Sequence, residues 1–234
     1  MTALDPSGRL ELIIFDCDGV LVDSEVASCQ ATAQYARSLG LELTDEEAHK
    51  RFVGMALPDV VRDLEHELDR KLPENTALIL RENLVRLMEK MAEPVSGSVE
   101  MLEEIRRLRM PVRVGSNSSI QEMEAKFSRT RMTGFFPENR IHSATDMKQP
   151  KPSPAVYLYA AEQEGRAPEN CLVIEDSDPG AEAAWRAGMS CILLRDEGQP
   201  LPSFWPQPGF VRIAHLSELA PLVETVITSQ GKKW

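Results

Sequence analysis

The chain has 234 residues, of which 42% are hydrophobic and 27% charged, so it can form a globular core and is neither disordered nor fibrous. Asp and Glu outnumber Lys and Arg by 37 to 26, which gives a formal net charge of −11. No segment concentrates positive charge as a nucleic-acid backbone requires, so we expect no nucleic-acid partner. A phosphorylated substrate would need a metal ion or a few well-placed cations to offset this acidity.

The longest apolar run near the N-terminus covers only residues 12–15, far short of the roughly 20 residues that span a bilayer, so we expect no membrane partner. Four cysteines are present without C-x-x-C spacing: Cys17, Cys29, Cys171 and Cys191. We interpret them as reduced, buried side chains of a cytoplasmic protein. The four histidines are not spaced as zinc ligands with any of these cysteines.

The first ninety residues predict one strand followed by helices. An apolar strand at 11–15 ends at the polar turn 16–19. Helical patterns then cover residues 25–39, 59–70 and 76–91. Another helical segment starts with capping-box spacing at Thr44. This stretch is therefore an all-helical block of about seventy residues.

From residue 94 onward, helices and strands alternate. Helices are predicted at 99–108, 120–127, 155–164 and 181–187, and strands at 112–115, 172–174 and 191–194. A loop is predicted between 127 and 155, and a proline-rich loop at 201–209 precedes a last strand and helix. The alternation predicts an α/β fold with a parallel sheet. We expect a core domain of residues 1–21 and 94–234, with the helical block of residues 22–93 inserted into it.

Polar residues follow three predicted strands at the points where they end. Asp16 and Asp18 follow the first, Ser116 and Asn117 the second, and Glu175 and Asp176 the third. Because the carboxyl ends of parallel strands share one edge of the sheet, these residues should converge. Four carboxylates in one crevice repel one another unless a cation lies among them, and Mg²⁺ with oxygen ligands fits best.

The pair Asp16 and Asp18 can divide the chemistry of phosphoryl transfer. One carboxylate can attack phosphorus and form an aspartyl-phosphate. The other can protonate the leaving oxygen and later deprotonate the hydrolytic water. Lys151, between two prolines, can place a positive charge on the phosphoryl oxygens.

Four ordered segments between residues 11 and 195 resemble the motifs of the haloacid dehalogenase superfamily. They are DCDGVLVDS at 16–24, SN at 116–117, KPSP at 151–154, and EDSDPG at 175–180 with AAWRAGM at 183–189. The helical block resembles the cap of the β-phosphoglucomutase-like subgroup. The resemblance therefore implies a doubly wound parallel sheet, with residues 22–93 as a helical cap domain over the site. The resemblance implies catalysis by Asp16 and Asp18, phosphate binding by Ser116, Asn117 and Lys151, and Mg²⁺ bound by Asp16, Asp176 and the backbone carbonyl of Asp18. Glu175 is either a weaker metal ligand or a residue that contacts the metal ligands without binding the metal itself.

The resemblance is strongest to phosphatases of sugar phosphates and phospho sugar acids such as 6-phosphogluconate. We expect a monomeric Mg²⁺-dependent phosphomonoesterase that acts on a small phosphorylated metabolite. Two alternatives remain: a hexose-phosphate mutase of the β-phosphoglucomutase type, and a non-catalytic binding module with this fold. Ser28 and Ser119 stand where those mutases carry a histidine and a lysine, which disfavours the mutase. Residues 52–57 are the expected counterpart of a substrate-selecting cap loop.

Overall fold

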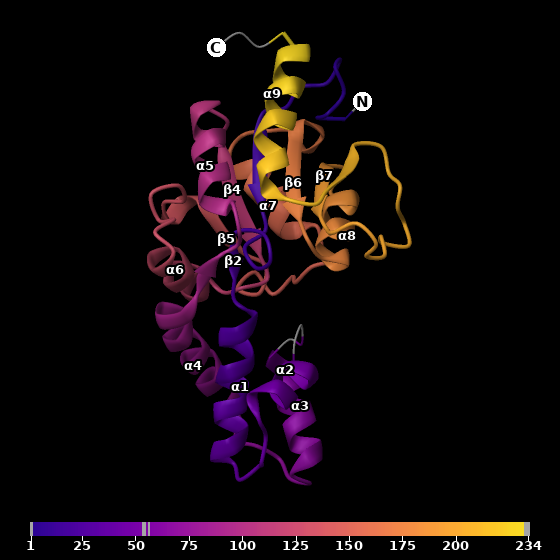
Figure 1. Ribbon diagram of the computed structural model, residues 1–234. Coiled ribbons are helices and arrows are strands. Elements are labelled where there is room, and N and C mark those ends of the chain that lie inside the picture. Colours follow the sequence, from indigo (N-terminus) through magenta and orange to yellow (C-terminus); the bar gives the residue numbers. More distant parts are fainter. Residues whose placement is uncertain (1, 53–54, 56, 232–234) are drawn as a thin grey trace.

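The computed structural model describes residues 2–52, 55 and 57–231, and its architecture is α/β (Figure 1). Within these residues, six parallel strands form one sheet in the order β5-β4-β1-β6-β7-β8. Their bounds are β1 Leu12–Phe15, β4 Val112–Ser116, β5 Ile141–Ser143, β6 Cys171–Glu175, β7 Ser190–Leu194 and β8 Phe210–Ile213. The predicted doubly wound parallel sheet is confirmed.

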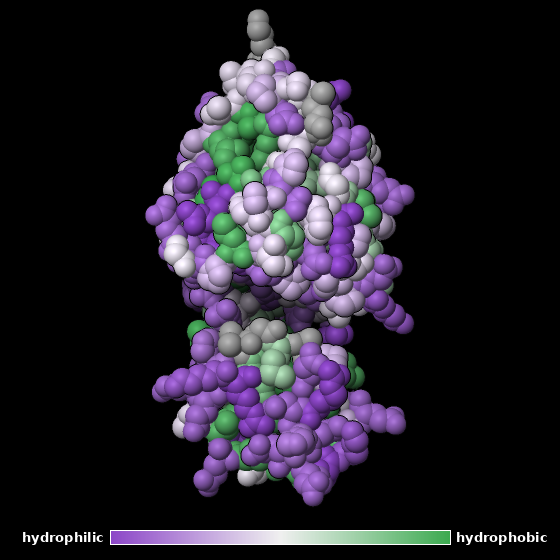
Figure 2. Space-filling model, turned by 90° about the vertical axis from the view of Figure 1, so that its right-hand side faces the viewer, coloured by the Kyte–Doolittle hydropathy of each residue, from purple (hydrophilic) through white to green (hydrophobic). Residues whose placement is uncertain are grey.

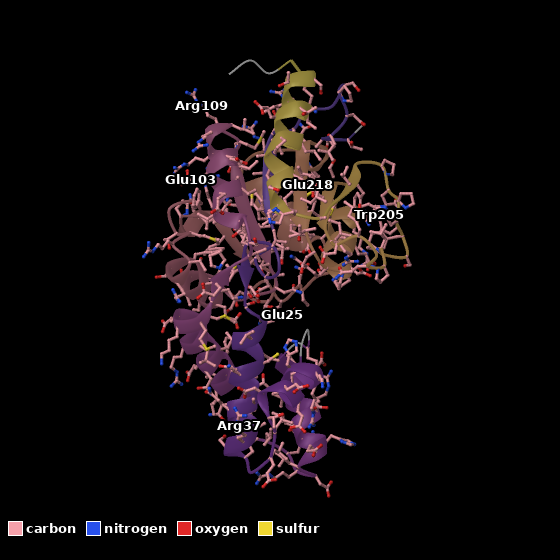
Figure 3. The ribbon with its side chains drawn as sticks, viewed as in Figure 1. Glu25, Arg37, Glu103, Arg109, Trp205 and Glu218 are labelled. Carbon is pink, nitrogen blue, oxygen red and sulfur yellow. The ribbon has the colours of Figure 1, made fainter. Side chains whose placement is uncertain are left out.

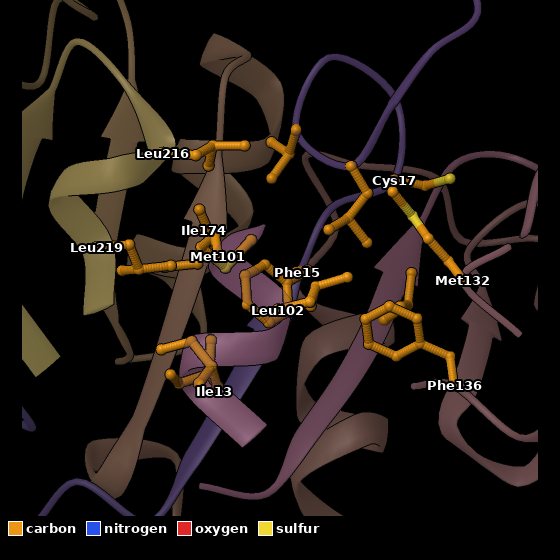
Figure 4. Close-up of a cluster of buried hydrophobic side chains, with 14 of the residues drawn as sticks. Ile13, Phe15, Cys17, Met101, Leu102, Met132, Phe136, Ile174, Leu216 and Leu219 are labelled. Carbon is orange, nitrogen blue, oxygen red and sulfur yellow. The ribbon is translucent and has the colours of Figure 1, made fainter. Parts of the chain in front are cut away.

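Successive side chains of β1 enter two different apolar cores, because both faces of the sheet are covered by helices. Ile13 and Phe15 face a core closed by α5 (Ser98–Arg107), α6 (Ile120–Arg129) and α9 (Leu219–Ser229). Figure 4 shows this core, in which the rings of Phe15 and Phe136 meet edge to face. Leu12 and Ile14 face the other core, closed by α7 (Ala155–Gln163) and α8 (Asp178–Arg186).

Four helices form a second block beside the carboxyl edge of the sheet (Figure 1). They are α1 Glu25–Ser38, α2 Asp45–Phe52, α3 Leu57–Glu67 and α4 Thr76–Met91. Their facing side chains form a separate apolar core that includes Tyr35, Phe52, Leu64 and Leu80. In Figure 2 the two blocks form two lobes joined by a narrower waist, and Figure 3 shows Glu25 at the level where they meet.

The two connections between the blocks lie side by side. Strand β2 (Val22–Asp23) pairs antiparallel with β3 (Glu93–Pro94), and the amide of Val95 donates to the carbonyl of Leu21 at 3.0 Å. The chain therefore leaves the sheet and returns to it at one place. Whether residues 22–93 behave as a separate domain stays a prediction.

The structure corrects the sequence prediction at two places. The expected loop between residues 127 and 155 contains β5, whose three residues pair with β4. Helix α8 begins at Asp178, three residues earlier than predicted, because the Ser177 hydroxyl caps it by accepting the Gly180 amide at 3.1 Å. All four cysteines are buried and unpaired, as predicted. No helix among the described residues is long and apolar enough to cross a membrane.

Candidate active site at the carboxyl edge of the sheet

The pairing register brings the polar strand ends together at the carboxyl edge. Phe15 of β1 lies opposite Val114 of β4 on one side and Ile174 of β6 on the other. The next residue along each strand is therefore Asp16, Gly115 and Glu175, at the same height in the sheet. This edge, where the strand order changes direction, is where open α/β sheets bind ligands.

Lys151 lies between two of the gathered carboxylates. Its Nζ donates to Asp16 Oδ1 at 2.5 Å and to Glu175 Oε1 at 2.7 Å. It also lies 4.8 Å from the centre of the Tyr157 ring. Burial alone would lower the pKa of Lys151, but the two carboxylates raise it above its ordinary value. The site thus holds one permanent positive charge beside Asp16.

One ammonium group does not balance the carboxylates at this edge. One oxygen from each of Asp16, Glu175 and Asp176 lies within 4.8 Å of the other two. Burial, together with the neighbouring negative charges, raises the pKa of Asp16 to about 7 and that of Asp176 to about 8. A divalent cation would relieve this repulsion, and oxygen donors are the ligands that Mg²⁺ prefers.

Glu175 is fully buried, and both of its oxygens are occupied by protein donors. Oε1 accepts from Lys151 Nζ and the Tyr157 hydroxyl, each at 2.7 Å. Oε2 accepts from the Asp176 amide at 3.0 Å and from the amide and hydroxyl of Ser177 at 3.0 and 2.9 Å. A Cβ on Gly180 would lie 1.7 Å from Oε1, so only glycine fits there. Glu175 therefore holds the neighbouring donors of the site in place, and its oxygens are less available to a metal ion.

The turn after β1 is shaped around Asp176. Gly19 has φ of +77°, in the left-handed region that favours glycine. A Cβ added at Gly19 would lie 2.0 Å from Asp176 Oδ2. The glycine of the D-x-D-G segment thus lets the backbone of the turn approach the Asp176 carboxylate, beside Asp16.

Asp18 has its own set of donors, separate from those of Asp16. Its Oδ1 accepts from Lys126 Nζ at 2.6 Å and from the Ser24 hydroxyl, and its Oδ2 accepts from the Ser118 hydroxyl at 2.7 Å. Burial opposes ionisation of Asp18, but the Lys126 charge and these hydrogen bonds outweigh it and lower the pKa of the carboxyl. The two aspartates are thus held in electrostatically different environments.

Ser116 and Asn117 lie at the end of β4, next to Asp16. Ser116 is buried, and its hydroxyl accepts from the Ser118 amide at 3.0 Å. The Asn117 side-chain oxygen accepts from the backbone amide of Lys151 at 2.9 Å and so ties the lysine loop to β4. The structure brings every predicted site residue to one edge, and their roles stay predictions.

Three residues of this edge were not predicted as site residues: Ser118, Lys126 and Tyr157. Ser118 directly follows the predicted pair Ser116 and Asn117, so position alone could have suggested it. Lys126 and Tyr157 lie on helices, and their carboxylate partners, Asp18 and Glu175, are more than 15 residues away in sequence. The only signal for Lys126 is a charged residue between Met123 and Phe127 on the apolar face of a helix.

The expected cap loop at 52–57 is only partly described, because Val53, Gly54 and Ala56 lie outside the described residues. Met55 is half-buried and packs on the core of the helical block. Arg51, at the end of α2 and next to this loop, pairs with Asp63 at 2.7 Å and Glu67 at 3.3 Å. Its guanidinium is thus engaged within the helical block.

Comparison with known proteins agrees with this geometry. The sequence model of a family described as haloacid dehalogenase-like hydrolase matches residues 13–194. The chain is 31% identical over 216 residues to the 6-phosphogluconate phosphatase of Escherichia coli, covering 92% of this chain and 95% of that protein. It is 30% identical over 187 residues to a phosphorylated carbohydrates phosphatase of Thermotoga maritima, covering 78% of this chain and 84% of the relative.

A solved structure shares the whole architecture. The crystal structure of a putative beta-phosphoglucomutase from Thermotoga maritima superposes with a TM-score of 0.75 at 26% sequence identity. The match covers 93% of this chain and all of the other, so the helical block and the sheet both have counterparts there.

Proposed function

Because the chain belongs to the haloacid dehalogenase-like hydrolase family and is a phosphatase, we propose that it hydrolyses a small sugar phosphate or phospho sugar acid with the help of Mg²⁺. The observation that carries the proposal is the buried contact between Lys151 Nζ and Asp16 Oδ1. This contact supports the proposal because it joins a carboxylate that could act as the nucleophile to an ammonium group that could bind phosphate, beside further carboxylates able to hold a metal.

The proposed reaction has two displacements at phosphorus. In the first, an oxygen of Asp16 forms a bond to phosphorus while the ester bond breaks, and Asp18 gives a proton to the leaving oxygen; because Lys126 and the hydrogen bonds favour its ionised form, Asp18 must take up this proton from solvent before the step. In the second, water attacks phosphorus, Asp18 takes a proton from that water, and the bond to Asp16 breaks to release phosphate. Asp18 is thus regenerated in its protonated form, and the sum is hydrolysis of one ester bond.

The metal site is proposed from the donor set. Asp16, Asp176 and the backbone carbonyl of Asp18 would hold Mg²⁺, and the raised pKa values of Asp16 and Asp176 fit a site that takes a cation. When bound, Mg²⁺ would neutralise charge on the phosphoryl oxygens. Glu175, whose oxygens are filled by donors, would orient Lys151 and the backbone next to Asp176.

Binding of the phosphoryl group is assigned to Lys151, Ser116 and Asn117. The ammonium group of Lys151 would contact a phosphoryl oxygen while keeping Glu175 as its partner. The Ser116 hydroxyl at the end of β4 and the short loop that follows it would supply neutral donors. The rest of the substrate would face the helical block, which we propose as a cap domain of residues 22–93 in a monomeric enzyme.

A substrate panel tests the proposal directly. Purified protein is incubated with 6-phosphogluconate, glucose 6-phosphate, β-glucose 1-phosphate and p-nitrophenyl phosphate, and phosphate release is measured with Mg²⁺ or with a chelator. We expect Mg²⁺-dependent release that Asp16→Asn lowers by about a thousandfold or more without unfolding the protein. Isomerisation of β-glucose 1-phosphate that outpaces phosphate release would instead identify a mutase. If the protein turns over none of these esters, the alternative of a non-catalytic binding module would be favoured.

A further inference from the structure

Lys126 is a buried lysine outside the segments that resemble family motifs. It lies on α6, and its side chain is only 2% exposed. Lysine is rarely buried to this extent unless its ammonium group is paired. Here Nζ donates to Asp18 Oδ1 at 2.6 Å and to the Ser118 hydroxyl at 2.7 Å.

We propose that Lys126 is a positioning residue that fixes the Asp18 carboxylate for proton transfer. The proposal rests on the proposed function, in which Asp18 exchanges protons with the leaving oxygen and with water. A proton donor must lie within hydrogen-bond reach of the leaving oxygen, and small displacements reduce its effect steeply. A group that holds this carboxylate therefore affects the rate without touching the substrate.

The hydrogen-bond directions show how Lys126 holds both oxygens of Asp18. An ammonium group can only donate, so the Ser118 oxygen accepts from Lys126 and its hydroxyl proton is left for Asp18 Oδ2 at 2.7 Å. Lys126 contacts Oδ1 directly and secures Oδ2 through Ser118. A closed triangle of three side chains thus restricts rotation of a carboxylate whose side chain is 36% exposed.

The two anchors of this triangle belong to the sheet block. Ser118 follows β4 and Lys126 lies on α6, the helix that starts directly afterwards. Ser24, the third donor to Asp18, precedes α1 and belongs to the start of the helical block. Lys126 and Ser118 therefore hold Asp18 against the same scaffold that carries Asp16, so the two aspartates keep a fixed relation.

Each aspartate of the pair has its own buried lysine. Lys151 contacts Asp16 at 2.5 Å, and Lys126 contacts Asp18 at 2.6 Å. Lys151 lies where a phosphoryl group would bind, whereas Lys126 lies on α6, the helix that follows the β4 loop. This division assigns Lys126 to the orientation of Asp18 and Lys151 to the phosphoryl group.

The test compares Lys126→Met with Arg129→Met, which removes a cation from the exposed side of the same helix, where Arg129 pairs with Glu93. The rate constant kcat/KM, which reports the first displacement, is measured for p-nitrophenyl phosphate and for the alkyl phosphate hydrolysed fastest in the panel above. An alkoxide leaves poorly without a proton, whereas p-nitrophenolate leaves readily. We expect Lys126→Met to lower kcat/KM for the alkyl ester about tenfold more than for the aryl ester. Arg129→Met should lower neither.

A double-mutant cycle separates positioning from general damage. In an Asp18→Asn background, Lys126→Met should change kcat/KM of the alkyl ester by less than about threefold, because the group that it positions is already gone. Lys126→Arg, which keeps a donor cation, should recover part of the alkyl-ester rate. Equal losses on both esters, or a full additional loss in the Asp18→Asn background, would overturn the proposal.

Two further results keep the outcome decisive. If Lys126→Met does not fold, Ser118→Ala removes the other side of the triangle with little change in packing, and it should show the same leaving-group preference. A uniform loss in Ser118→Ala would overturn the positioning role. Failure of the proposed function is distinguished by the wild-type protein itself, which would then release no phosphate from either ester.

Discussion

Substitution of Glu175 by glutamine is the most informative change for the scaffold of the site. The side chain keeps its shape, but the amide has one acceptor oxygen where the carboxylate has two. Five donors converge on Glu175, from Lys151, Tyr157, Ser177 and the Asp176 backbone. The amide nitrogen must therefore face donors in either orientation, and Glu175 is fully buried, so water cannot compensate.

The expected loss in the free energy of unfolding depends on which way the glutamine amide is oriented, and we take the orientation that breaks fewer hydrogen bonds. With its oxygen toward Ser177, the glutamine keeps the three bonds at Oε2, and Tyr157 can rotate its hydroxyl to accept from the amide. The bond to the Lys151 ammonium group is lost, and hydrogen bonds to charged groups contribute about 1.5–3 kcal/mol. Removal of one partner of a buried ion pair costs about 3–5 kcal/mol, but Lys151 keeps Asp16 as a partner. We therefore expect a loss of about 2–3 kcal/mol.

Urea unfolding in the presence of chelator measures this loss as a difference in the free energy of unfolding between wild type and variant. Glu46→Gln is the matched control, because Glu46 makes an exposed ion pair with Lys50 and its substitution should cost less than about 1 kcal/mol. A loss below about 1 kcal/mol for Glu175→Gln would refute the assignment of Glu175 as a saturated buried acceptor.

Three other changes probe neighbouring features. Gly180→Ala should destabilise the protein in thermal melts, because its Cβ would lie 1.7 Å from Glu175 Oε1; an unchanged melting temperature would contradict the close approach. Burial and nearby carboxylates raise the pKa of Asp176 from 3.8 to about 8 when no metal is bound. In chelator, the protonated form of Asp176 therefore contributes its full stability below about pH 4, and this stability is lost progressively up to about pH 8. Asp176→Asn should make the melting temperature depend less on pH over this range, and an identical slope would show that Asp176 does not titrate there. Met55→Ala should change kcat/KM among sugar phosphates but leave that of p-nitrophenyl phosphate within about tenfold, and a uniform loss would make Met55 a packing residue.

Much of the fold could be predicted because buried parallel strands are short apolar runs with abrupt polar ends. The strands β1, β4, β6 and β7 were predicted within two residues of their observed bounds, and the bounds of α4 matched. Strand β5 was not predicted, since its three residues, Ile141–Ser143, include a histidine and a serine and are too short for a periodic pattern. It forms because its backbone pairs with β4 at the sheet edge.

The candidate site could be predicted only as far as strand ends determine it. The convergence of Asp16, Ser116 and Asp176 follows from parallel topology alone. The partners that distinguish the carboxylates come from helices, and a helical pattern does not specify which distant residue a buried polar side chain contacts. Tyr157 on α7 and Lys126 on α6 are therefore evident only once the helices are packed on the sheet.

The central claim is that Asp16 receives the phosphoryl group, and trapping that group on the protein tests it most directly. Asp18→Asn protein with Mg²⁺ is mixed with p-nitrophenyl phosphate, quenched in acid and digested for mass spectrometry. The leaving group needs no proton, whereas hydrolysis of the intermediate needs the missing base, so the intermediate should accumulate. We expect one phosphoryl group on the peptide that contains Asp16, and none when Asp16→Asn is added. A phosphoryl group on another residue, or release of p-nitrophenol with an unmodified Asp16, would contradict the account.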